Sequence, residues 1–161
     1  MPDRIKQFDA RDLCLRAYER QMTGQLDEAV HMYKKSIELF PTAEAHTFLG
    51  WTYSFMGMFE EAIAECKKAI VLDPNFGNPY NDIGSYLIEL GKDDEAIPYF
   101  EKALLAKKYE TPSQPHFFLG RIYLKKGLLQ QATEELHKAL KEDPEHELAK
   151  EVLDQLEMQI Q

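Results

Sequence analysis

The chain has 161 residues, with 28 acidic and 19 basic side chains and a formal net charge of −9. A chain of this length buries roughly two-thirds of the surface that its unfolded form exposes, so it makes one soluble domain or one short repeat array without needing disulfides. The negative charge disfavours nucleic acids and anionic membranes as partners, because both would be repelled before a specific contact formed.

The sequence shows no recognisable targeting signal and no paired cysteines. No apolar run is long enough to cross a membrane, and the first residues lack the apolar core of a signal peptide. The sequence therefore predicts a cytoplasmic protein. Cys14 and Cys66 lie far apart, and neither has a second cysteine nearby. We therefore expect no redox pair, no metal site and no cofactor.

A six-residue pattern that begins with glycine and ends with alanine recurs four times along the chain. The copies are Gly24-Gln-Leu-Asp-Glu-Ala29, Gly57-Met-Phe-Glu-Glu-Ala62, Gly91-Lys-Asp-Asp-Glu-Ala96 and Gly127-Leu-Leu-Gln-Gln-Ala132. Each glycine follows a segment of helical periodicity and can adopt the positive φ that ends a helix. The acidic or amide side chains after it favour the start of the next helix. Each copy therefore predicts a helical hairpin.

Small residues recur on both helices of these hairpins. In the second copy they belong to a face with i, i+3, i+4 and i+7 spacing, made of His46, Leu49, Gly50 and Tyr53. Small side chains let neighbouring helices approach closely, so these positions predict the contacts between helices. In the first helices they are Ala17, Gly50, Gly84 and Gly120, and in the second helices Ala29 with Ser36, Ala62 with Ala69, Ala96 with Ala103, and Ala132 with Ala139.

Proline closes three copies, at Pro41, Pro74 and Pro144, because it cannot continue the preceding helix. The third copy has Lys108 instead and two extra residues before the fourth, so its second helix is expected to run on or to end in a longer loop. After the last proline, residues 147–161 are predicted to form a helix that caps the open end of the stack. Its apolar residues at helical spacing are Leu148, Val152, Leu153, Leu156 and Ile160.

These recurring glycine, alanine and proline positions resemble the tetratricopeptide repeat family, whose unit is a helix-turn-helix of about 34 residues. The repeats are placed approximately at residues 10–42, 43–76, 77–110 and 113–146, followed by the capping helix at 147–161. The resemblance implies an all-α fold, a right-handed α-solenoid of four repeats, and the binding of another protein along a concave groove lined by the first helices.

Twelve residues are expected to line that groove. They are Cys14, Tyr18 and Met22 in the first repeat, Thr47, Trp51 and Phe55 in the second, Asn78, Asn81 and Ser85 in the third, and Phe117, Arg121 and Lys125 in the fourth. The first half offers apolar surface for an anchor side chain. The asparagine amides suit a peptide backbone. The two basic residues suit an acidic element.

The same residues have other interpretations. Trp51 and Phe55 are equally placed to pack as core, and Arg121 and Lys125 to form a solvated face. The two-carboxylate clamp of heat-shock co-chaperones is disfavoured, because its lysine, asparagine and arginine sites do not match. The residues at those sites are Cys14, Tyr18, Phe48, Asn78 and Asp82.

No catalytic constellation is recognisable. None of the five histidines has a partner at the spacing of a metal motif, and the glycines stand at repeat spacing rather than in a phosphate-binding loop. His46 and His116 hold the same repeat position and are interpreted as packing residues. We therefore expect no enzyme but a protein-binding module, an adaptor or co-chaperone-like scaffold. The alternatives are a self-associating structural module, and so a homo-oligomer, and a secretion-type chaperone.

Overall fold

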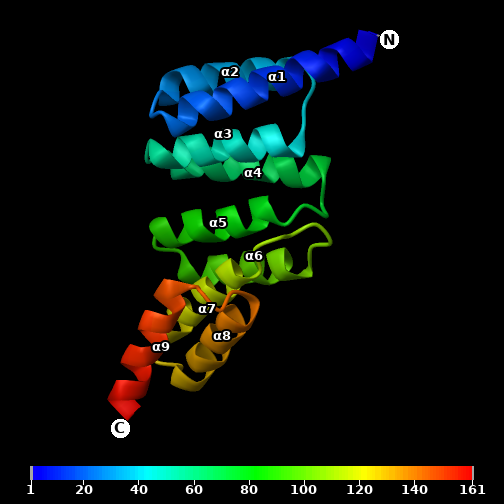
Figure 1. Ribbon diagram of the computed structural model, residues 1–161. Coiled ribbons are helices and arrows are strands. Elements are labelled where there is room, and N and C mark those ends of the chain that lie inside the picture. Colours follow the sequence, from blue (N-terminus) through cyan, green and yellow to red (C-terminus); the bar gives the residue numbers. More distant parts are fainter. Residues whose placement is uncertain (1, 161) are drawn as a thin grey trace.

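The computed structural model describes residues 2–160, and every regular element in that range is a helix (Figure 1). The helices are α1 (Pro2–Met22), α2 (Leu26–Leu39), α3 (Ala43–Phe55), α4 (Phe59–Leu72), α5 (Asn78–Glu89), α6 (Asp93–Leu105), α7 (Ser113–Lys125), α8 (Leu129–Glu142) and α9 (Glu147–Ile160).

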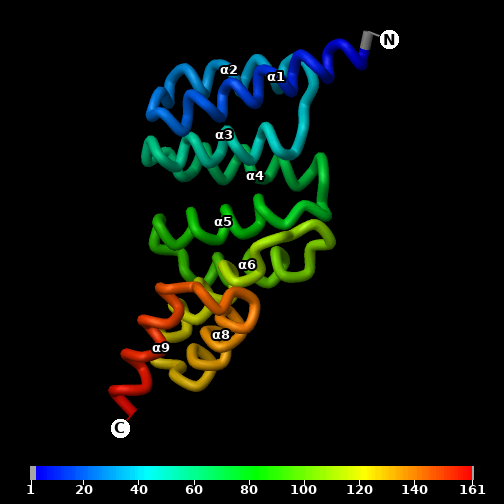
Figure 2. The backbone as a smooth tube through the Cα atoms, in the orientation of Figure 1, coloured from blue at the N-terminus to red at the C-terminus, as the bar shows by residue number. Residues whose placement is uncertain are grey.

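Consecutive helices pair as antiparallel hairpins, and the hairpins stack in chain order. Figure 1 shows this stack, and Figure 2 shows that the two ends of the chain lie at opposite ends of it. Helices α1, α3, α5 and α7 also contact one another in succession, so they share one side of the stack. This arrangement confirms the predicted helical solenoid.

The hairpin turns depend on the four repeated glycines. Gly24, Gly57, Gly91 and Gly127 have φ values of 80°, 74°, 74° and 76°, and nothing lies within 4 Å of where a side chain would begin. Glycine is thus required by the backbone conformation and not by crowding. At each turn the N–H that follows the glycine donates to the carbonyl five residues earlier, at 2.8–3.0 Å. This bond ends the first helix and fixes the path to the second.

The glycines within helices serve the opposite purpose. A Cβ on Gly50 would lie 2.9 Å from the Ala62 carbonyl oxygen, and one on Gly84 would lie 2.6 Å from the Phe100 ring. A Cβ on Gly120 would lie 2.9 Å from the Leu136 side chain. In the second, third and fourth hairpins, the two helices therefore approach too closely for a residue larger than glycine at these positions, as the sequence predicted.

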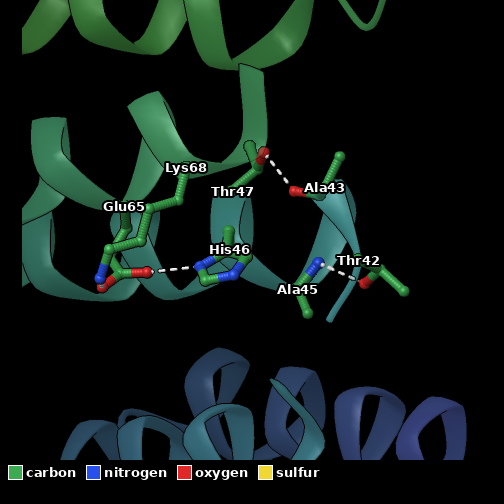
Figure 3. Close-up of polar contacts among 7 residues, drawn as sticks. All are labelled: Thr42, Ala43, Ala45, His46, Thr47, Glu65 and Lys68. Carbon is green, nitrogen blue, oxygen red and sulfur yellow. Dashed lines mark hydrogen bonds and ion pairs between the residues drawn. The ribbon is translucent and has the colours of Figure 1, made fainter. Parts of the chain in front are cut away.

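A histidine-glutamate pair joins the two helices of the second hairpin (Figure 3). His46 Nδ1 lies 2.6 Å from Glu65 Oε2, and Lys68 Nζ lies 3.0 Å from Glu65 Oε1. Burial acts to raise the pKa of Glu65, but the hydrogen bonds from His46 and Lys68 outweigh it and hold the pKa below its usual value.

The fourth hairpin repeats this arrangement. His116 Nδ1 lies 2.6 Å from Glu135 Oε2, and Lys138 Nζ lies 3.2 Å from Glu135 Oε1. Both histidines are thus packing residues between paired helices, as predicted.

The connection after α6 resolves the two alternatives that Lys108 left open. Helix α6 ends at Leu105, and a longer loop follows. This loop is fastened to the connection before α5, because Gly77 N donates to the Lys108 carbonyl and Lys108 N donates to the Asn75 carbonyl, both at 2.9 Å. The Lys108 ammonium also pairs with Asp73. The loop after α6 is therefore held against the connection between α4 and α5.

The ends of the stack differ in part from expectation. Helix α9 buries Ala149, Leu153 and Leu156, whereas Leu148 and Ile160 are exposed, so its inner face is rotated from the predicted one. At the other end α1 begins at Pro2, before the first predicted repeat, and residues 3–9 are exposed.

No helix within residues 2–160 combines the length and the apolar character that crossing a bilayer requires.

Candidate functional site

Helices α1 and α3 expose apolar side chains on their shared side of the stack. Met22 and Phe55 are 58% and 56% exposed, Tyr18 is 37% exposed, and Trp51 is partly buried. The rings of Trp51 and Phe55 lie 5.1 Å apart, so the two form one surface. We call Tyr18, Met22, Trp51 and Phe55 the aromatic stripe.

Two of the twelve groove residues lie in the interior instead. Thr47 is buried, and its hydroxyl donates to the Ala43 carbonyl of its own helix at 2.7 Å. Phe117 is 4% exposed, because the ring of His146, the residue before α9, covers it. The centres of the two rings lie 4.8 Å apart. The sequence prediction was wrong in placing these two side chains on an open surface.

Cys14 lines an apolar cavity of about 450 Å³ between α1, α2 and α3, together with Leu15, Phe40 and Phe48. Burial, with a smaller contribution from Glu44, raises the pKa of the Cys14 thiol to about 11. The thiol therefore stays protonated at neutral pH, which suits contact with an apolar side chain and not nucleophilic chemistry.

A second cavity, of about 490 Å³, lies between α3, the start of α4, α5 and α7; we call it the central pocket. Its apolar walls are Trp51, Phe59, Ile88 and Phe118, and its polar lining is Ser54, Asp82, Ser85, Tyr86, Glu89 and Arg121. The structure thus brings together three predicted groove residues, Trp51, Ser85 and Arg121, from three repeats.

Asp82 is one of the central-pocket residues that lie outside the twelve predicted for the groove. Burial raises the pKa of Asp82 to about 7, although the neighbouring Asn81 side chain acts to lower it. No basic side chain within residues 2–160 forms an ion pair with Asp82. Its repeat position held the signal, since Asp82 precedes Gly84 by two residues just as Phe48 precedes Gly50.

The predicted asparagines lie in different surroundings. Asn78 is exposed and lines a separate cavity beside Lys108 and Tyr109, on the fastened loop. Asn81 is partly buried, and its side-chain oxygen has no hydrogen-bond partner. The two amides therefore do not form one clamp.

The two basic residues of α7 are not equivalent. Lys125 Nζ lies 3.0 Å from Asp93 Oδ2, so its charge is compensated within the chain. The Arg121 guanidinium lies over the Phe117 ring, 5.7 Å from its centre, and forms no ion pair within the described residues. Arg121 is therefore the basic group of this pair that is available to a partner.

The described residues contain no group of side chains that could bind a metal ion. Across residues 2–160, no three histidine, cysteine, aspartate or glutamate side chains are grouped closely enough to hold a metal ion.

Comparison with protein-family models identifies the repeats. Models described as tetratricopeptide repeat match residues 43–76, 78–109 and 113–146, which together cover more than half of the chain.

Curated relatives match part of the chain. Protein STIP1 homolog of Dictyostelium discoideum is 38% identical over 90 residues, a match that covers 53% of this chain and 16% of the relative. The chain spans between 11% and 28% of the length of the curated relatives that it matches.

Solved structures share the fold over most of the chain. PilF of Pseudomonas aeruginosa superposes with a TM-score of 0.85 at 23% identity, over 93% of this chain and 68% of that one. YrrB, described as a TPR protein with an unusual peptide-binding site, superposes with a TM-score of 0.70 at 25% identity, over 88% of this chain and 72% of that one.

Proposed function

The chain belongs to the tetratricopeptide repeat family, and from that premise we propose that it is a non-catalytic scaffold that holds a peptide or helical segment of a partner protein on its concave face. The observation that carries this proposal is the aromatic stripe. Its side chains come from two helices that share one side of the stack and remain exposed or partly exposed, and two of them, Trp51 and Phe55, are in contact. Adjoining apolar side chains left open to water favour an interaction surface.

The stripe and the Cys14 cavity suit an apolar anchor residue of the partner. Fully burying one such side chain contributes roughly 1.5–3 kcal/mol to binding. An acidic element of the partner would meet Arg121, since Lys125 is already paired with Asp93.

Two comparisons support this proposal without identifying the partner. The similarity to Protein STIP1 homolog favours an adaptor or co-chaperone-like role. The similarity to YrrB, with its peptide-binding site, favours a peptide segment as the ligand.

Affinity capture with a double variant of the stripe tests the proposal. Trp51→Ala/Phe55→Ala should lose the proteins that the wild type captures, with helicity by circular dichroism retained. A matched control is Val71→Ala/Leu105→Ala, which removes two exposed apolar side chains from α4 and the end of α6. The control should capture the same proteins as the wild type. Equal capture by all three chains would place the working surface elsewhere.

A self-associating module is the second candidate. Ile5, Phe8 and Leu15 are 64%, 74% and 57% exposed on α1, at the open end of the stack. A second copy that covers these side chains would make a homo-oligomer. Light scattering over a dilution series tests this, because a monomer at every concentration would exclude it.

A further inference from the structure

We propose that the central pocket receives a basic side chain, arginine or lysine, from the bound segment of the partner. This inference rests on the proposed function and adds the chemistry of one recognised residue. It is argued from the hydrogen-bonding groups of the pocket, from its charge and from its aromatic walls.

The lining of the central pocket includes an acid that no cation of the described residues pairs with. Asp82 lines the pocket and forms no ion pair within residues 2–160. The Asn81 side chain stabilises this carboxylate only in part, since burial still raises the pKa of Asp82. A partly buried carboxylate in this situation is stabilised by further hydrogen-bond donors or by a positive charge. A guanidinium or an ammonium group provides both.

The Tyr86 side chain lies in the same pocket with an unused polar atom. Tyr86 is 5% exposed, and its hydroxyl has no hydrogen-bond partner. Burial, followed by the nearby Asp82 charge, raises the pKa of Tyr86, although the Ser54 side chain acts to lower it. Buried hydroxyls are normally paired, so an unpaired one lining a cavity points to a ligand that is absent. One cationic side chain can donate to both Asp82 and Tyr86.

The other hydroxyls of the central pocket also leave acceptors toward it. Ser54 Oγ donates to the Trp51 carbonyl at 2.6 Å, and Ser85 Oγ donates to the Asp82 carbonyl at 2.9 Å. Each serine has thus used its proton within its own helix and keeps only lone pairs for a ligand. Donor-rich ligands match this lining better than acceptor-rich ones.

The aromatic walls fit the hydrocarbon and the charge of a basic side chain. Trp51, Phe59 and Phe118 line the pocket. Arginine and lysine pack their long stems on apolar surface, and a cation over an aromatic face gains about 0.5–2 kcal/mol.

Other occupants fit less well. An acidic side chain placed beside Asp82 would be repelled by the like charge, so an acidic element of the partner is expected at the exposed Arg121 instead. An apolar side chain would bury Asp82 without a cation, and the carboxyl would then have to stay protonated. Arg121, the basic lining residue, lies over the Phe117 ring and leaves Asp82 unpaired.

Random-peptide display on the immobilised full chain tests the inference without a known partner. The chains compared are the wild type, Asp82→Asn, Tyr86→Phe and the control Asp154→Asn, which makes the same chemical change at an exposed site on α9. Both pocket variants preserve shape, so they are expected to fold, and thermal melts verify this. The enriched peptides are then synthesised, and their affinities for all four chains are measured by calorimetry.

The wild type and Asp154→Asn should enrich peptides with arginine or lysine at one fixed position. Asp82→Asn should lose this enrichment and bind the same peptides about tenfold more weakly or worse, and Tyr86→Phe should weaken them less. Enriched peptides without a fixed basic residue, or with unchanged affinity for Asp82→Asn, would overturn the inference and leave the proposed function intact. If the wild type enriches no peptide, both are overturned.

Discussion

Phe48 on α3 and Asp82 on α5 occupy the same position of the repeat but have opposite chemistry, one aromatic and one acidic. We call the contact of the second hairpin with the first, at Phe48, the first junction, and that of the third hairpin with the second, at Asp82, the second junction. Phe48, two residues before Gly50, packs against the rings of Tyr18 and Tyr33 at 5.5 Å and 6.1 Å. Asp82, two residues before Gly84, puts a carboxylate there. The fourth hairpin returns to an aromatic residue at this position, since Phe118 stacks on Phe100 at 5.2 Å.

The difference shows how much a repeat stack tolerates. Each hairpin contacts only its neighbours, so a poor contact at one junction leaves the others unchanged. Polar residues at core positions that lower stability without local compensation are characteristic of functional sites. The Asp82 junction opens into the central pocket, with its polar lining, whereas at the other junction Phe48 packs on Tyr18 and lines the apolar cavity beside Cys14.

The largest effect is expected when the aromatic residue of the first junction is replaced by the acid found at the second. Phe48→Asp should lower the free energy of unfolding by about 3–5 kcal/mol, because it removes aromatic packing and buries a charge. Urea unfolding followed by circular dichroism measures this change. The control is Phe55→Asp, at an exposed residue of the same helix, which should cost much less. Equal effects of both variants would contradict the comparison.

The reverse change removes the charge from the second junction. The folded protein holds the pKa of Asp82 at about 7, above the usual value for an aspartate, so the folded state binds a proton more tightly than the unfolded state does. Wild-type stability therefore falls as pH rises from about 4 to about 7 on account of this group. The wild type loses about 4 kcal/mol in this way, since each pKa unit corresponds to about 1.4 kcal/mol. Asp82→Asn lacks this loss, so it should be more stable than the wild type above pH 7 by up to about 4 kcal/mol.

The pH dependence separates this effect from a general gain in packing. Below about pH 3, Asp82 is protonated in both states, and the two proteins should unfold at similar urea concentrations. The difference should grow through the range between the two pKa values and reach a plateau above about pH 8. A difference between the two proteins that is the same at about pH 3 and about pH 8 contradicts the assignment to Asp82 ionisation.

The smallest effect is expected at the loop between α6 and α7, which is fastened to the connection before α5. Lys108→Ala removes an exposed ion pair with Asp73 and should shift the urea midpoint only slightly, with no shift in high salt. Lys108→Pro also removes the N–H that donates to the Asn75 carbonyl, so it should lower the midpoint more. Equal midpoints for the two variants would mean that this backbone bond contributes nothing.

Local features of the fold were predictable from sequence, because they depend on neighbouring residues. The positive φ of Gly24 and its three equivalents follows from where each helical pattern stops. The close approach at Gly50 follows from its spacing within one helix face. The inner face of α9 was harder, because choosing between Leu148 and Ala149 requires knowing how closely α8 approaches.

The candidate site was less predictable, because distant segments determine the exposure of each residue. Phe117 belongs to the predicted groove face but is covered by His146, which lies 29 positions later. Thr47 and Trp51 share one helix face, yet only Thr47 is buried. The surroundings of Asp82 include Cys66, on α4, and Tyr109, on the loop after α6. Repeat spacing alone does not show that they meet.

The neighbour-only packing of the helices also bears on how the chain acquires its structure. Every extensive contact joins helices that are adjacent in the chain or separated by one helix, so few contacts close long loops. Chains rich in such local contacts fold quickly. During synthesis, each hairpin can form on the one before it as it emerges from the ribosome, long before α9 exists.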